Sequence, residues 1–280
     1  MHRRMFPWLA VAGLLVSACG GSAEPSFPED SFGIVANRDV GTGSSRVLVG
    51  ILQPDGARLG SPDISVDLVA NPIDDPADTQ SAPGIFTWII EDVVGLYRVE
   101  FEFDRPGTWE ITVQPENGDT LAPAAVNVLE ETFSPNIGDR APVVDTPTLA
   151  EFPYAELTTD PMPDPRFYEI SLPDALASGR PTVLVFSTPA YCVTAACGPL
   201  LDLVKSMADD YPDTNFVHVE VYTGLTEPDF QPDPAHLAPA AGLDGWSLPS
   251  EPWVFVINEN GIVTARFEGA MAADELRAAL

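Results

Sequence analysis

The sequence predicts two domains of different class, an all-β sandwich followed by an α/β domain. Three observations support this prediction. Apolar and polar residues alternate with a period of two over residues 31–131, as in antiparallel sheets with one buried face. Residues 132–165 are rich in proline and acidic residues and have no regular period. Residues 166–280 contain continuous apolar runs and a helical pattern, which are typical of buried strands joined by helices.

The first 18 residues are predicted to form a leader. Arg3 and Arg4 precede a short apolar run over residues 6–16, and small residues lead to Cys19. The apolar run is shorter than the ~20 residues that span a bilayer, which indicates a signal peptide rather than a transmembrane helix. Because the cleavage site ends in Cys19, the pattern resembles the bacterial lipoprotein signal. The resemblance implies cleavage after residue 18, a lipid on Cys19 and a flexible tether over residues 19–30. An ordinary secretory signal with a chance cysteine is the alternative.

The leader therefore predicts an extracytoplasmic protein that is anchored to the cell membrane by lipid. No later segment is long and apolar enough to span a membrane, so the lipid would be the only anchor. The chain has 42 acidic and 13 basic residues and a formal net charge of −29. Such a surface repels phosphate backbones, which excludes nucleic acid as a partner.

Residues 31–131 contain the signals of a β-sandwich. Alternating apolar positions occur in the runs 47–51, 64–68, 97–103 and 109–113. Turn residues separate the runs, including Pro54-Asp55-Gly56 and the Asp-Arg-Pro-Gly sequence at 104–107. Several short strands in this length predict a sandwich. The sequence GLYRVEFEFDRPGTWEITV resembles the closing hairpin of immunoglobulin-like modules on bacterial surfaces. This resemblance implies an immunoglobulin-like spacer or docking domain and names no ligand.

Residues 132–165 are predicted to be extended connecting chain that includes the start of the second domain. The sequence Ile137-Gly138-Asp139-Arg140-Ala141-Pro142 resembles the opening of redox domains in peroxiredoxins and membrane-anchored thioredoxin-like proteins. Four apolar runs then read as strands, at 181–187, 215–222, 253–258 and 262–268. An amphipathic helix follows the first run, with apolar residues at 200, 203, 204 and 207, and a second helix closes the chain at 272–280.

Four features of residues 166–280 resemble the thioredoxin-like family. A buried strand ends at Phe186, and a cysteine motif follows and leads into a helix. Ser250-Glu251-Pro252 precedes the third strand, where the family has a cis-proline, and a hairpin turn at Gly261 comes next. The resemblance implies a thioredoxin-like domain, a cis Glu251–Pro252 bond and a partner-binding groove lined by Pro252. Glu251 would lie beside that proline and Trp253 behind it.

The cysteine spacing departs from the C-x-x-C of this family, because four residues separate Cys192 from Cys197. A close pair in an oxidising compartment is expected to form a disulfide. On a regular helix the two Cα atoms would be roughly 8–9 Å apart, which exceeds the limit of about 7 Å for a disulfide. At least one cysteine must therefore lie before the helix, and Gly198-Pro199 allows the helix to start nearby.

Two alignments of the cysteines with the family remain open. Cys197-Gly198-Pro199 can match the family's Cys-Gly-Pro, which makes Cys197 the attacking thiol. Alternatively Cys192 attacks, following the aromatic Tyr191 that would line the groove, and we favour this second alignment. Either thiol would lie at a helix N-terminus, which stabilises thiolate.

The favoured function is thiol–disulfide exchange with a protein partner in the cell envelope, without a cofactor or a bound metal. A static structural disulfide in a non-catalytic binding lipoprotein is one alternative. Copper delivery is another, because some thioredoxin-fold assembly proteins bind copper through two cysteines and a histidine, and His218 and His236 are candidates. The order of residues that a peroxidatic site requires is not kept.

Overall fold

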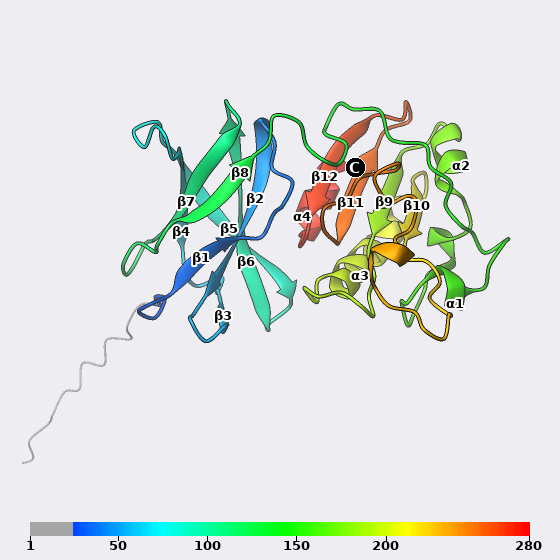
Figure 1. Cartoon of the computed structure of the whole chain (residues 1–280), viewed down its shortest axis with the longest axis horizontal. Helices are drawn as coiled ribbons and strands as arrows, with labels where there is room; N and C mark the ends of the chain where they lie inside the picture. Colours follow the sequence, from blue (N-terminus) through cyan, green and yellow to red (C-terminus); the bar gives the residue numbers. More distant parts are fainter. Residues whose placement is uncertain (1–24) are drawn as a thin grey trace, which may run out of the picture.

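The computed structural model describes residues 25–280, and Figure 1 shows its two sheets lying side by side. The leader and Cys19 lie outside the described residues. Within residues 25–280, no helix combines the length and the apolar character needed to cross a membrane.

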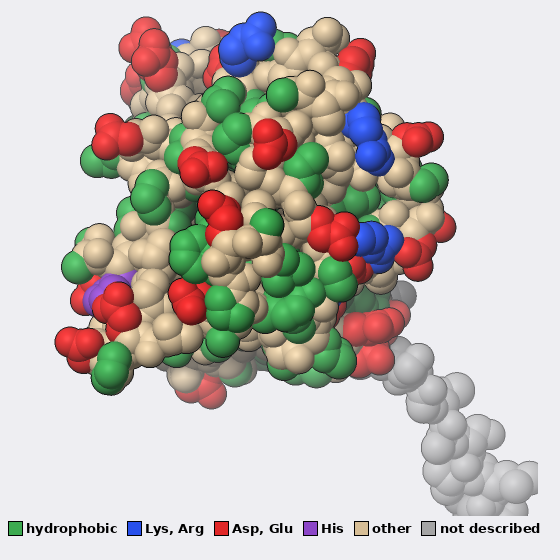
Figure 2. All heavy atoms as spheres, turned by 90° about the vertical axis from the view of Figure 1, so that its right-hand side faces the viewer, with side chains coloured by type: hydrophobic (Ala, Val, Ile, Leu, Met, Phe, Trp, Pro, Cys, Tyr) green, Lys and Arg blue, Asp and Glu red, His purple; other side chains and the backbone are tan. Residues whose placement is uncertain are grey.

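Acidic side chains outnumber basic side chains on the outer face of the second domain. Figure 2 views the molecule from the side of this domain and shows many aspartate and glutamate side chains but few lysine and arginine side chains. This distribution agrees with the net charge of −29 for the whole chain.

The first domain is an eight-stranded antiparallel sheet with the order β1-β2-β6-β5-β4-β7-β8, in which β3 pairs with β2. The strands are β1 (Phe32–Val35), β2 (Gly43–Leu52), β3 (Arg58–Leu59), β4 (Val66–Pro72), β5 (Gln80–Ile90), β6 (Val94–Phe103), β7 (Gly107–Pro115) and β8 (Ala124–Val128). The prediction that the first domain is all-β is confirmed, because all of its regular elements between residues 32 and 128 are strands.

Strand β5 joins the two halves of this sheet because it changes partner along its length. Its residues 80–84 pair with β4, whereas residues 85–90 pair with β6. The sheet also bends back on itself, since single bridges join Phe32 to Ala122 and Gly41 to Leu129. The sheet is therefore nearly closed, and its inner face encloses one core.

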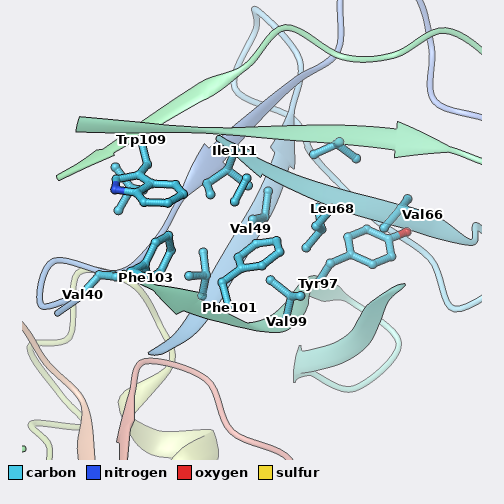
Figure 3. Close-up of a cluster of buried hydrophobic side chains, with 14 of the residues drawn as sticks. Val40, Val49, Val66, Leu68, Tyr97, Val99, Phe101, Phe103, Trp109 and Ile111 are labelled. Carbon is cyan, nitrogen blue, oxygen red and sulfur yellow. The ribbon is translucent and has the colours of Figure 1, made fainter. Parts of the chain in front are cut away.

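The core of the first domain consists of the inward positions of the alternating strands. Val49 of β2, Leu68 of β4, Phe101 of β6 and Ile111 of β7 point into the same interior (Figure 3), and each is at most 2% exposed. Outward positions such as Glu100 and Glu102 of β6 are polar and exposed, as the period of two predicted, whereas the outward Leu48 of β2 is buried against Leu96 and Ala270.

The second domain has a four-stranded sheet with the order β10-β9-β11-β12. Strands β9 (Thr182–Phe186) and β10 (Asn215–Val219) are parallel, and β11 (Trp253–Ile257) runs antiparallel to both β9 and β12 (Val263–Glu268). Helix α3 (Cys197–Met207) connects β9 to β10, and helix α4 (Ala273–Ala279) follows β12. This order of strands and helices is the thioredoxin-like order that the sequence predicted.

Two hydrophobic clusters cover the opposite faces of this sheet, and every residue of β9, β10 and β11 is buried. The segment before the sheet is largely irregular and includes helices α1 (Tyr154–Leu157) and α2 (Leu172–Ala177) and the 3₁₀ helix η1 (Pro165–Phe167). Leu157 and Phe167 are buried in one of the clusters, and the backbone of Arg140 forms an isolated β-bridge with that of Ile262, next to β12. This segment therefore packs on the second domain.

Charged side chains form much of the contact between the two domains. Arg46 of β2 binds Glu275 of α4 with two hydrogen bonds of 2.5 and 3.0 Å. Arg266 of β12 lies 2.7 Å from the fully buried carboxylate of Asp39, and Glu268 accepts hydrogen bonds from the backbone N–H groups of Arg38 and Asp39. The two domains are thus held in a defined orientation.

Candidate functional site

The two cysteines lie where strand β9 passes into helix α3, and they form a disulfide with a Cα–Cα distance of 5.9 Å. Helix α3 begins at Cys197, so Cys192 lies in the loop before the helix. This arrangement agrees with the prediction that the regular helix cannot contain both cysteines. Ala195, between them, has a φ of 61°, which reverses the chain so that the two sulfur atoms meet.

The two sulfur atoms differ in their surroundings. Cys197 is fully buried, whereas Cys192 is half-buried. The backbone N–H of Cys197, in the first turn of α3, donates to Cys192 Sγ over 3.3 Å, and Thr194 Oγ1 lies at the same distance. A helix N-terminus and its free amides favour a negative sulfur, so this position would stabilise a thiolate on Cys192.

The proline loop lies next to the start of the cysteine loop. The Glu251–Pro252 bond is cis, as the sequence predicted. Trp253 at the start of β11 pairs with Phe186 at the end of β9, which places Pro252 and Glu251 beside the residues that lead to Cys192. Pro252 O also accepts a hydrogen bond from Gly269 N in the loop between β12 and α4.

Glu251 and Trp253, on either side of Pro252, have different surroundings. Burial raises the pKa of the Glu251 carboxyl, and contacts with Thr188 oppose this effect. Trp253 is 1% exposed, stacks on Phe255 at 5.3 Å and lies beneath the guanidinium of Arg266. It therefore belongs to the core of the second domain and is not available for contact with a partner.

Tyr191 and Val193 flank Cys192 and are exposed, at 39% and 94% respectively. The ring of Tyr191 packs on Phe230 at 5.1 Å, and Phe230 also contacts Tyr222 and His236. The long loop between β10 and β11 thus supports the cysteine loop from one side. An exposed apolar residue on each side of a half-buried sulfur suits contact with another protein.

A buried carboxylate lies beneath the cysteine loop. Glu220, which directly follows β10, is 4% exposed and accepts hydrogen bonds from the backbone N–H of Thr159 and from the hydroxyls of Thr158 and Thr159. Thr159 Oγ1 in turn accepts from the N–H of Ala190, two residues before Cys192. Burial raises the pKa of Glu220 to about 7.

The two histidines proposed as copper ligands lie in different surroundings. His218 is buried, with Nδ1 2.8 Å from Tyr168 Oη and Nε2 2.9 Å from Ser187 Oγ, so both ring nitrogens are engaged. His236 lies 3.0 Å from Asp233 in the loop between β10 and β11. Residues 25–280 contain no group of three or more His, Cys, Asp or Glu side chains placed to hold a metal ion.

Three structural features near the candidate site were not identified from the sequence: Thr188, Glu220 with its threonine partners, and the contact of the first domain with the second. A signal existed only for Glu220, which is a charged residue within the apolar run NFVHVEVY. Its partners Thr158 and Thr159 come from the irregular segment, where no periodicity indicates what packs on what.

Comparisons with known proteins found similar solved structures, including the following two. The chain is similar to a protein assigned as thiol:disulfide interchange protein DsbE from Chlorobium tepidum, with a TM-score of 0.36 and 19% identity over 52% of this chain and 96% of that protein. It is also similar to the sensor domain of the anti-sigma factor RsgI4 from Pseudobacteroides cellulosolvens, with a TM-score of 0.24 and 10% identity over 36% of this chain and 97% of that domain. No family model and no curated protein sequence matches the chain. Neither TM-score reaches 0.5, and the description of the second domain therefore rests on its own sheet order and loops.

Proposed function

We propose that this chain is an extracytoplasmic, lipid-anchored protein that carries out thiol–disulfide exchange through Cys192 and Cys197. The observation that supports this proposal best is the inequality of the two sulfur atoms. Cys192 is half-buried and accepts the N–H of Cys197, whereas Cys197 is buried directly behind it. A nucleophile that is accessible and stabilised as a thiolate, with a resolving thiol at contact distance, is the arrangement that exchange requires.

In the reduced protein, the Cys192 thiolate attacks one sulfur of the partner's disulfide. The partner's other sulfur leaves as a thiolate, and a mixed disulfide joins the two proteins. Cys197 then loses its proton and attacks Cys192 Sγ, which forms the Cys192–Cys197 disulfide and releases the partner's second thiolate. Two electrons pass from this chain to the partner, and the reverse sequence oxidises a partner dithiol.

The remaining parts of the molecule receive supporting roles in this proposal. Pro252, Glu251 and Tyr191 border the approach to the disulfide and would contact the partner. The first domain would be an immunoglobulin-like module that holds the exchange domain away from the membrane. The lipid on Cys19 and the tether over residues 19–30 would keep the molecule at the membrane surface.

The exchange proposal predicts a marked difference between the cysteines. After reduction, iodoacetamide should modify Cys192 much faster than Cys197 at neutral pH, because a stabilised thiolate reacts and a buried thiol does not. Cys197→Ser should accumulate a mixed disulfide with a disulfide-containing protein such as insulin, and Cys192→Ser should not. The measurements are peptide mapping by mass spectrometry and non-reducing gels. Equal, slow alkylation of both thiols with no mixed disulfide would leave the cysteine pair as a static crosslink.

The lipid anchor is tested separately. Cys19→Ser should abolish acylation and move the protein from the membrane fraction to the soluble fraction, because the lipid is proposed as the only anchor. Metabolic labelling with a fatty acid and membrane fractionation measure both effects. A Cys19→Ser chain that still carries lipid would disprove the assignment of the leader.

A further inference from the structure

A groove lies between the first domain and the start of helix α3. It has a volume of about 710 Å³. Strand β5 forms one wall, and Ala196, Pro199, Leu203 and Met271 line the other. Figure 1 shows β5 and β6 reaching from the first domain toward α3. The groove therefore combines surfaces that are more than 100 residues apart in the sequence.

The wall formed by β5 is the edge of a strand. Residues 85–90 pair with β6 on one side, while β4 pairs only with residues 80–84, so the other side of residues 85–90 has no strand partner among residues 25–280. Six consecutive residues, 86–91, line the groove. Successive side chains of a strand point to opposite faces, so a continuous run indicates that the edge faces the groove. An unpaired edge presents N–H and C=O groups to which another extended chain can bind.

The groove reaches residues that neighbour Cys197 in the sequence. Ala196 directly precedes Cys197, and Pro199 belongs to the first turn of the helix that Cys197 begins. On the same wall, Ala270 and Met271 follow Gly269, which is bonded to Pro252 O. A polypeptide lying along β5 would thus pass beside the cysteine loop and the proline loop.

The charge of the groove indicates what kind of segment fits it. Apart from its apolar lining, the groove has two exposed carboxylates, Glu91 on the β5 side and Asp202 on α3. Asp202 lies 2.8 Å from Lys205, which also forms an ion pair with Asp160. Glu91 forms no ion pair within the described part of the chain. The surrounding chain is strongly acidic, with a net charge of −29. Complementarity favours a segment that carries lysine or arginine.

We infer that the unpaired edge of β5 and helix α3 together bind an extended, positively charged segment of the partner polypeptide next to its reactive cysteine. This inference rests on the proposed exchange function and assigns the first domain a direct part in partner recognition. The partner segment adds a strand to β5 through main-chain hydrogen bonds. Its basic side chains lie near Glu91 and Asp202, and its apolar side chains contact Leu203 and Met271.

The first test uses the reduced full-length chain and two synthetic disulfide-containing peptides of equal length, one with lysines and one with glutamates beside the cysteine. The lysine peptide should react at least about tenfold faster. In Glu91→Lys/Asp202→Lys the ratio of the two rates should fall to near unity. The ratio divides out any change in the reactivity of Cys192 itself. The matched control, Asp55→Lys/Glu259→Lys, makes the same charge change at exposed turns outside the groove and should retain most of the preference.

The second test probes the strand edge directly. Cys197→Ser is joined to the lysine peptide as a mixed disulfide, and amide hydrogen exchange is compared with and without the peptide. Protection should appear in residues 86–90. Equal ratios in the two double variants, or no protection of residues 86–90 in the mixed disulfide, would overturn the inference. Failure of the exchange proposal would look different, because the wild-type chain would then not react even with the small neutral hydroxyethyl disulfide.

Discussion

Replacing Arg46 by methionine should lower the free energy of unfolding by about 3 kcal/mol, which is the lower end of the cost of breaking a buried ion pair. The Arg46 and Glu275 side chains are only 10% and 7% exposed, and the substitution leaves the Glu275 carboxylate buried without its bidentate partner. Arg98 lies 3.2 Å from the same carboxylate and keeps the cost from rising further. Arg46 also donates to Ala270 O, so the contact between the domains is weakened at two points.

Denaturant unfolding followed by tryptophan fluorescence measures this effect. Arg166→Met is a suitable control, because Arg166 pairs with Asp164 and Asp209 at the surface and its side chain is 43% exposed. Such pairs contribute about 1 kcal/mol or less. Arg46→Met combined with Glu275→Met should recover part of the loss, because both buried charges are then removed. If Arg46→Met costs no more than Arg166→Met, the domain contact does not depend on this ion pair.

The fold could be predicted where one local pattern determines the structure. The period of two in residues 97–103 fixes which side chains face the core, and Phe101 and Phe103 are indeed buried. The apolar run at 181–187 likewise becomes the central strand β9, because a strand covered on both faces has no polar side. The cysteine pair and the cis bond before Pro252 could be predicted for the same reason, because spacing and position relative to neighbouring strands identify them.

The contact between the domains could not be predicted in this way. Arg46 lies in an alternating strand and reads as an ordinary outward-facing polar residue. Its partner Glu275 is 229 positions away, and no periodic pattern connects two such residues. The closure of the first sheet was also hidden, because β5 changes partner in the middle of one continuous strand. The groove beside the disulfide depends on both features, so only the structure reveals it.

Glu220→Gln should make the protein more stable above neutral pH, by up to about 3 kcal/mol. Burial raises the pKa of Glu220 from 4.5 to about 7. The folded protein therefore binds this proton more tightly than the unfolded chain, and stability falls as the pH rises from 4.5 to 7. Below pH 4.5 the carboxyl is protonated in both states, so the difference between wild type and variant should be smallest there. Glutamine stays neutral and can still accept the hydrogen bonds of Thr159.

The measurement is the difference in unfolding free energy between Glu220→Gln and wild type across this pH range. The difference is needed because other groups also titrate. Burial lowers the pKa of His218 to about 4, and it raises the pKa of Glu251 and Glu268. These contributions are present in both proteins and largely cancel. Glu91→Gln is the matched control, because Glu91 is exposed and its substitution should give a nearly flat difference curve.

The direction of the Glu220→Gln curve decides what the buried carboxylate does for the cysteine loop. Glu220 reaches that loop through Thr159, whose hydroxyl accepts the N–H of Ala190, and through its contact with Thr188. If stability of the variant rises with pH relative to wild type, the carboxylate is held in the fold at a cost, and a role in the loop explains its presence better than stability does. If the stability of the variant instead falls with pH relative to wild type, the ionised carboxylate is stabilised by its threonine donors, and Glu220 serves mainly to fasten residues 158–159 to the sheet.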